Sequence, residues 1–525
     1  MKISSGVIAS AVFLGVSLAA GPANADAGEK ARGSGYFESE VSEQARMAPR
    51  SRELSGNRAE RKADRASERI LMWFDVMLDT HAISQTPGQI GAGQQGGPLR
   101  STRGYAMTMI AVFDAVNAFE GKYLSYGDIP LAEREASIDA AIAYAAHDVM
   151  VRVWSQQAAR LDQILADDLA SINASAAAKA KGRAVGQAAA LAILDKRMNL
   201  TTNLADDGAQ ITEVSWGQGG SVATGNKDAR GFAINSGQTG AFQWTPDPET
   251  NNQLALGANW GAVTPFVLSS GAQFRAGPFA ASGTARYRGI WEDVKAVGAT
   301  TETTGSTSTA RTQFIGNYWG YEGTPLLGAP PRLYNQIAVE LAERQKIDEP
   351  IELARYLALV NISMADAGIA VWDTKYFYNY WRPVTALRSD DGDAATQSDP
   401  DWTPFGISRA NLANALRVTP DFPAYSSGHA AFGSAMFETA RGFMPDNTAF
   451  TFVSEEYNGE TADPFNPGIV RPLVPVRFAS LKKAELENAR SRVYNGSHWQ
   501  LDSDVGARQG QQVARYARAK AFKRP

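Results

Sequence analysis

The chain has 525 residues, with 51 Lys and Arg against 55 Asp and Glu, a formal net charge of −4 and no cysteine. The near balance of charges argues against nucleic acid as the main partner, and the absence of thiols excludes disulfides, zinc–thiolate sites and cysteine nucleophiles. Chemistry that needs imidazole must use one of four histidines: His81, His147, His429 and His498.

Residues 1–25 have the pattern of a cleavable secretory signal. Lys2 is followed by an apolar run, Val7–Ala20, and then by Ala23-Asn24-Ala25, which fits a small-x-small cleavage site. A membrane anchor is the alternative, although a bilayer span needs about 20 apolar residues. We expect cleavage after Ala25, a secreted or periplasmic mature protein, and no membrane span after the signal.

The rest of the chain predicts a mainly α-helical fold in four parts. Residues 26–69 are polar and densely charged, which predicts a mobile arm or an exposed helix. Apolar residues from 70 to 198 recur at three- and four-residue spacing, as in a first helical bundle. Residues 199–330 are rich in Gly, Thr, Ser and Pro and predict an irregular connection. Residues 331–525 form the second helical part, with helices expected at 331–372, 408–417, 428–443 and from about 480.

The first segment with candidate site residues runs from Lys375 to Pro383. Lys375 and Arg382 enclose five aromatic residues. On a single helix, seven residues make about two turns, so both cations would project from one face about 10 Å apart. This pattern predicts an oxyanion clamp, and a solvated basic face is the alternative.

The second segment is a turn of Pro, Ser and Gly that leads into an apolar helix at Ser427-Gly428-His429. Free N–H groups at a helix start bind anions, and Ser427 can cap the helix or donate its hydroxyl to the anion. Gly428 lets an oxyanion approach the backbone, and His429 can act as an acid or a base. The alternative is an ordinary capped helix with an incidental histidine.

The third segment runs from Ser491 to Asp502. His498 and Asp502 are four residues apart, so on a helix the carboxylate could hold the imidazole in one tautomer. A core histidine paired with a local acid is the alternative. Arg492 adds a third cation. Together the three segments contain the groups that bind a tetrahedral oxyanion with several negative charges.

In order and spacing, the three segments resemble the signature shared by vanadium-dependent haloperoxidases and type 2 phosphatidic acid phosphatases. The length of the chain and the upstream segments 317–323 and 328–336 make it similar to the haloperoxidases, over roughly residues 290–510. The resemblance implies two four-helix bundles, an anion site in the second bundle, and vanadate as the cofactor.

The resemblance also implies roles for single residues. His498 would bind vanadium, Asp502 would orient His498, and His429 would be the acid–base group for peroxide. Lys375 would polarise bound peroxide. The residues implied to hold the oxyanion are Lys375, Arg382, Ser427, Gly428 and Arg492.

Three further residues complete the implied site. Trp372 and Phe422 would form a halide pocket of the chloroperoxidase type, and Glu322 would pair with a site arginine. The sequence departs from the family at Ser426, where the family has proline, and this change should add a hydroxyl near the site.

The implied activity is an exported haloperoxidase that oxidises chloride or bromide with hydrogen peroxide to hypohalous acid, which then halogenates an organic acceptor. Vanadium would act as a Lewis acid, so no redox cofactor is needed. An exported acid phosphatase with a phosphorylated His498 is one alternative. A non-catalytic oxyanion-binding protein is another. The oligomeric state is not predicted.

Overall fold

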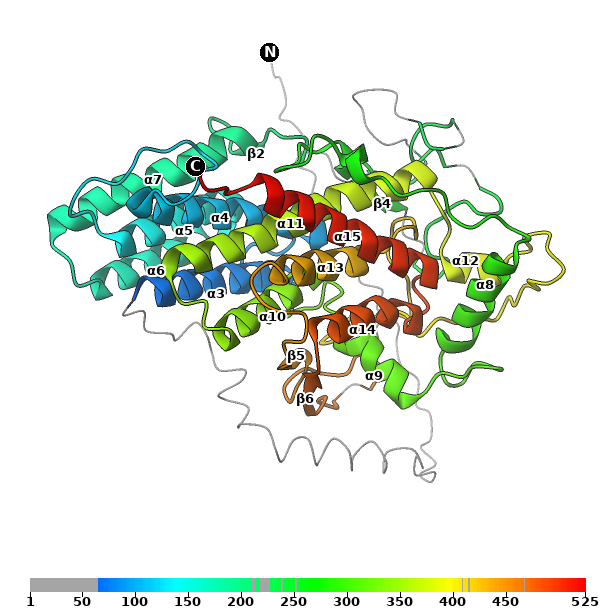
Figure 1. Cartoon of the computed structure of the whole chain (residues 1–525). Helices are drawn as coiled ribbons and strands as arrows, with labels where there is room; N and C mark the ends of the chain where they lie inside the picture. Colours follow the sequence, from blue (N-terminus) through cyan, green and yellow to red (C-terminus); the bar gives the residue numbers. More distant parts are fainter. Residues whose placement is uncertain are drawn as a thin grey trace, which may run out of the picture.

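The structure, a computed structural model, describes residues 65–209, 213–217, 227–229, 231–237, 239–250, 253–407, 409–413, 416–466 and 468–525. The expected signal and most of the expected arm lie outside the described residues. The described chain is mainly helical, as the sequence predicts (Figure 1).

Helices from the first part of the chain pack together at one end of the molecule (Figure 1). They are α3 (Ala66–Ser84), α4 (Gly97–Glu120), α5 (Ile138–Val153), α6 (Ala158–Ser171) and α7 (Ala176–Arg197). Helix α5 contacts the other four. Helix α3 begins before the expected start of the core at Ile70, because Arg69 is already buried there and donates to Asp168 at 2.9 Å.

Short elements fill much of the connecting region. Two antiparallel pairs join β1 (Met198–Asn199) to β2 (Leu204–Ala205) and β3 (Glu213–Ser215) to β4 (Leu254–Leu256). Two 3₁₀ turns and two helices follow: η3 (Trp260–Ala262), η4 (Gly271–Phe274), α8 (Ala285–Val297) and α9 (Ala310–Tyr318). Buried Asp366 anchors this region, because its carboxylate accepts from the backbone N–H groups of residues 266–268 at 2.6–3.0 Å.

The second part of the chain contains a long helix, α11 (Pro350–Tyr378), which packs against α4, α13 and α15. The others are α10 (Pro330–Arg344), α12 (Pro383–Arg388), α13 (Gly428–Ala440), α14 (Leu481–Tyr494) and α15 (Gln500–Lys520). Among the described helices, only α11 is long and apolar enough to cross a membrane, and 94% of that apolar window is buried in the protein.

Two features of this part differ from the prediction. An antiparallel hairpin of β5 (Phe450–Asn458) and β6 (Leu473–Phe478) interrupts the helices. The described residues of 408–417 are not helical, so the expected helix there is wrong. The chain instead bonds to neighbouring segments: the N–H of Ile407 donates to Val418, and that of Asn411 donates to Ala462.

The closest helix packing fixes the start of α13. A side chain at Gly506 would collide with the carbonyl oxygen of Ser427, and one at Gly510 would collide with that of Ala431. The two glycines therefore allow α15 to lie directly against the backbone of α13. Ser427 caps α13, so this contact also positions the Ser-Gly-His segment.

Candidate active site

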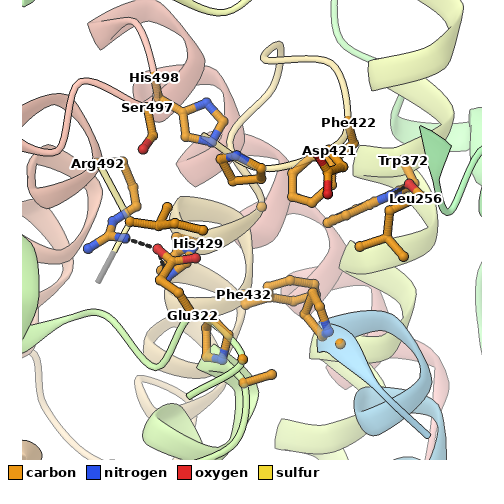
Figure 2. Close-up of a pocket in the computed structure, with 18 of the residues that line it drawn as sticks. Leu256, Glu322, Trp372, Asp421, Phe422, His429, Phe432, Arg492, Ser497 and His498 are labelled. Carbon is orange, nitrogen blue, oxygen red and sulfur yellow. Dashed lines mark hydrogen bonds and ion pairs between the residues drawn. The ribbon is translucent and has the colours of Figure 1, made fainter. Parts of the chain in front are cut away.

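A cavity of about 170 Å³ lies at the start of α13. His429, Glu322 and Arg492 group on one side of it, and Trp372, Phe422 and Leu256 lie on the other (Figure 2). The sequence-predicted residues that line the cavity are Glu322, Trp372, Phe422, Gly428, His429, Arg492 and His498. The other predicted residues, Lys375, Arg382, Ser427 and Asp502, do not line it and connect to it through the contacts described below.

Lys375 and Arg382 converge on this cavity, but not from one helix face. Helix α11 ends at Tyr378, Asn379 takes the left-handed conformation with φ 48°, and Arg382 is the N-cap of α12. The expectation of one continuous helix is therefore wrong, because Asn379 ends α11 and Pro383 starts the next helix. Both cations are buried, which excludes the solvated basic face.

The turn at 422–424 brings the two cations together. The ammonium of Lys375 donates to the carbonyl oxygens of Pro423 and Ala424 at 2.8 and 2.9 Å. Nε of Arg382 donates to the carbonyl of Phe422 at 3.0 Å. The two cationic groups lie 5.0 and 4.9 Å from the centre of the Phe422 ring.

Nearby carboxylates compensate the charges of Lys375 and Arg382 only in part. Burial, reinforced by nearby Arg382, holds the pKa of Lys375 well below its ordinary range. Burial also lowers the pKa of Arg382 to about 10, although the Asp502 carboxylate opposes this effect. An anion bound between the two groups would stabilise both charged forms.

The second segment starts α13 as predicted. The Ser427 hydroxyl accepts from the N–H of Ala430 at 3.4 Å and caps the helix, and its own N–H donates to the carbonyl of Asp502 at 3.0 Å. Gly428 lies against Trp372, since an added Cβ would be 3.0 Å from the indole ring. Ser426 differs from expectation, because its hydroxyl donates to Gln509 and does not line the cavity.

His429 lies in the first turn of α13 and is buried. Its Nε2 is 3.1 Å from the carbonyl of Gly320 and 3.4 Å from the carboxylate of Glu322. A carbonyl only accepts, so Nε2 carries the proton and Nδ1 of the neutral ring is an acceptor. Burial holds the pKa of His429 well below its ordinary value, and the charge of Arg492 adds to this effect.

His498 lies just before α15, not within the helix, yet the expected contact with Asp502 is present. Nδ1 of His498 donates to the carboxylate at 2.9 Å, and the same oxygen accepts from the N–H of Trp499 at 3.1 Å. The proton on Nδ1 leaves Nε2 as the acceptor, which Arg382 approaches at 3.1 Å. Burial lowers the pKa of His498 well below its ordinary value and raises that of Asp502 to about 7.

Glu322 reaches Arg492, the third cation. Its carboxylate accepts from Nη1 of Arg492, whose Nη2 donates to the carbonyl of Gly316 at 2.6 Å. Glu456 of β5 holds the segment around Glu322, because its carboxylate accepts from the N–H of Tyr321 at 3.0 Å. Burial raises the pKa of Glu322, against the charge of Arg492.

Trp372 and Phe422 form part of the apolar wall. Their ring centres are 4.9 Å apart at an angle of 53°, and the indole N–H donates to the carbonyl of Leu256 at 3.1 Å. Phe432 of α13 continues this wall (Figure 2). One side of the cavity is therefore apolar and the other carries titratable groups.

Sequence reasoning missed Ser497, Asp421 and Arg409, which also line the cavity. Ser497 directly precedes His498, the expected vanadium-binding residue, and this neighbour relation could have identified it from the sequence. Asp421 and Arg409 lie in loops, where spacing does not reveal proximity to a site. His81 and His147 lie outside this cavity.

The residues present fit a bound oxyanion. Within the part of the chain that the structure describes, Nη2 of Arg382 and the hydroxyl of Ser497 are buried without a hydrogen-bond partner. Buried donors of this kind usually have a partner. Three buried cations, these donors and the lone pair on Nε2 of His498 match the chemistry of a tetrahedral oxyanion.

Comparisons with known proteins relate the second helical part of the chain to a family of known chemistry. Residues 355–524 match the family model described as "VCPO second helical-bundle domain". Vanadium chloroperoxidase of Curvularia inaequalis is 37% identical over 219 residues, which are 36% of this chain and 36% of that protein. The chain thus matches about a third of the length of this curated relative.

Solved structures share the fold. A bacterial vanadium-dependent iodoperoxidase has a TM-score of 0.62 and 21% identity, with 86% of this chain and 97% of that chain covered. The apo form of a bacterial vanadium-dependent chloroperoxidase has a TM-score of 0.58 and 16% identity, with 81% of this chain and 94% of that chain covered.

Proposed function

We propose that the chain is an exported, vanadate-dependent haloperoxidase, because residues 355–524 match the second helical-bundle domain of this family and the chain is 37% identical to a vanadium chloroperoxidase over 219 residues. Its substrates are hydrogen peroxide and chloride or bromide, and the product, hypohalous acid, halogenates an organic acceptor. The halide, the organic acceptor, the vanadate cofactor and the export are parts of this proposal.

One observation carries the proposal: three buried cations surround the imidazole of His498. Lys375, Arg382 and Arg492 are each at most 1% exposed. The carboxylates of Glu322 and Asp502 oppose them, but burial raises the pKa of both acids. Buried positive charge without full compensation is costly and favours an anionic ligand.

The proposed vanadate ligand is Nε2 of His498, which Asp502 keeps unprotonated through the bond to Nδ1. Arg382, Arg492 and Lys375 would neutralise the oxyanion, and Ser427 and Gly428 would bind it at the start of α13. Bound vanadate would supply a Lewis acid for peroxide without a change of oxidation state.

His429 is the proposed acid–base group. Its low pKa keeps the ring neutral, and the bond from Nε2 to Gly320 leaves Nδ1 free to accept a proton from peroxide. Protonated His429 is then stabilised by Glu322, 3.4 Å away. Two N–H groups of the Lys375 ammonium donate to backbone carbonyls, so its third N–H would be the donor to the bound substrate.

The Trp372–Phe422 wall supports chloride or bromide as the halide. An apolar, aromatic surface lowers the hydration of a small anion, and the buried cations supply the attraction that replaces it. A relative in the same fold is described as an iodoperoxidase, so iodide is the third halide to measure.

The test measures how orthovanadate changes the activity of the protein. Apo-protein is incubated with orthovanadate, and halogenation of monochlorodimedone is measured with peroxide and chloride, bromide or iodide from acidic to neutral pH. The proposal predicts that vanadate produces activity and that His498→Ala abolishes it. No halogenation with chloride or bromide would refute it. Hydrolysis of p-nitrophenyl phosphate that vanadate inhibits would instead identify an acid phosphatase.

The proposal includes an architecture and a compartment. We infer two four-helix bundles, with boundaries at 70–198 and 331–525, joined by the region 199–330. The contacts within α3–α7 and those of α11 with α13 and α15 support this division, and the packing of α11 against α4 joins the two bundles. We also propose that residues 1–25 are removed on export, which mass spectrometry of the secreted protein tests through a new N-terminus at Asp26.

A further inference from the structure

A second cavity shares no lining residue with the first, and its wall includes Tyr425, which comes two residues before Ser427. It has a volume of about 440 Å³, and three arginines line it: Arg275, Arg286 and Arg508. They come from three separate parts of the chain: the segment after η4, helix α8 and helix α15. Such convergence of guanidinium groups in one concave site favours an anionic ligand.

Two of these arginines are available to a ligand. Arg275 is already paired with Asp373, through bonds of 2.6 and 2.8 Å. No described residue forms a hydrogen bond or ion pair with the guanidinium of Arg286 or Arg508. Both charges act on the hydroxyl of Tyr425, which lines the same cavity. The cavity therefore carries two positive charges that its walls do not neutralise.

Part of the wall of this cavity is formed by polar side chains that hydrogen bonds hold in place. Gln509 is only 2% exposed, and its amide donates to the carbonyl of Phe274 and to the hydroxyl of Thr374, both at 2.9 Å. Its carbonyl oxygen accepts from Ser426. Tyr425 donates to the carbonyl of Gly277 at 2.6 Å. These hydrogen bonds fix Tyr425 and Gln509 in the wall of the cavity, which Arg286 and Arg508 also line.

We propose that this cavity binds a small oxyanion with at least two negative charges, such as phosphate or sulfate. A planar guanidinium matches an oxyanion through two parallel hydrogen bonds, whereas a halide ion uses only its charge. The site is separate from the cavity at His498. Two of its wall residues adjoin Ser426: Tyr425 precedes it in the chain, and Gln509 accepts a hydrogen bond from its hydroxyl. A ligand in this cavity would therefore bind next to the residues that lead into α13.

Isothermal titration calorimetry with inorganic phosphate tests this site on the full chain. We expect two binding events, because phosphate also resembles vanadate at His498. Arg492→Gln should remove the first event. Arg286→Gln combined with Arg508→Gln should weaken the second at least about tenfold, since each lost charge-assisted bond is substantial. Sulfate, but not chloride, should compete for the second event.

A double variant at the end of α10 and just after it, Arg344→Gln with Lys346→Gln, removes the same charge from exposed residues outside both cavities and should leave both events unchanged. A single event that only Arg492→Gln removes would overturn the second site. If the parent chain instead shows only one event, which the Arg286 and Arg508 double variant weakens and Arg492→Gln does not change, that result would contradict the proposed function and support the second site.

Discussion

The carboxylate of Asp502 accepts a hydrogen bond from Nδ1 of His498 at 2.9 Å while the same oxygen accepts from the N–H of Trp499. The acid thus holds both the imidazole and the first turn of α15. Its removal should release the ring and change which nitrogen carries the proton.

We therefore expect Asp502→Ala to weaken orthovanadate binding by about tenfold to a hundredfold, the usual effect of removing a group that orients a metal-binding histidine. Equilibrium dialysis measures this affinity. Asp504→Ala is the matched control, since Asp504 is an exposed acid in the same helical turn. Equal affinity in Asp502→Ala and the parent chain would contradict the role of Asp502.

Glu322 should determine how far activity extends to low pH, through its effect on the pKa of His429. Its carboxylate lies 3.4 Å from His429 and pairs with Arg492. In Glu322→Gln the loss of this negative charge makes protonation of His429 harder, because burial and Arg492 already lower its pKa. The pH profile of kcat/KM should shift to lower pH, and vanadate should bind more tightly.

Glu487→Gln serves as the control for Glu322, because Glu487 bonds to the indole of Trp319 and does not line the cavity. A pH profile that is the same in Glu322→Gln and the parent chain would show that Glu322 does not act on His429.

Two histidines outside the site should give opposite pH dependence of stability. Burial lowers the pKa of His81 to about 3, so the folded state disfavours its charged form. Between pH 6.5 and 3 the unfolded chain binds a proton that the folded chain does not, and stability falls as pH falls, by about 1.4 kcal/mol per unit. His81→Asn should remove this slope.

His147 should give a pH dependence of stability of the opposite sign. Burial lowers its pKa, but hydrogen bonds to Asp148 and Asp162 outweigh burial and raise it above its ordinary value. Its stabilisation is present below pH 6.5 and is lost as pH rises through the folded-state pKa. Thermal unfolding of both Asn variants from pH 4 to 8 measures the two slopes, and slopes of equal sign would contradict the assignment.

The contact between α13 and α15 should tolerate no side chain at Gly506. A methyl group there meets the carbonyl of Ser427, so backbone must move. We expect Gly506→Ala to lower the free energy of unfolding by about 1–3 kcal/mol and to reduce vanadate affinity. Gly289→Ala on α8, where nothing lies within 4 Å, should instead stabilise by about 0.5–1 kcal/mol. Chemical denaturation compares the two.

The sequence predicted the mainly helical fold and most of the residues that meet at the cavity. Periodicity is a local signal, and it was strong in α4, α5 and α11. The path between the motifs was less predictable. Asn379 ends α11 before Arg382, and the hairpin β5–β6 has no periodic pattern that separates it from a loop.

Contacts across the chain were the least predictable. The carbonyl of Gly320 and the carboxylate of Glu322 reach His429 from a segment more than 100 residues away, held by Glu456 of the unpredicted hairpin. Ser426 shows the same limit, because its hydroxyl points to Gln509 in the helix interface. Local spacing does not specify such directions.

Within the described residues, the first 200 positions contribute only Gly97 and Pro98 to the wall of the site cavity, and neither has a titratable side chain. The groups that we propose to bind the anion all come from residues 322–502. Replacements of polar or charged residues in the early helices should therefore leave the charged groups around His498 unchanged.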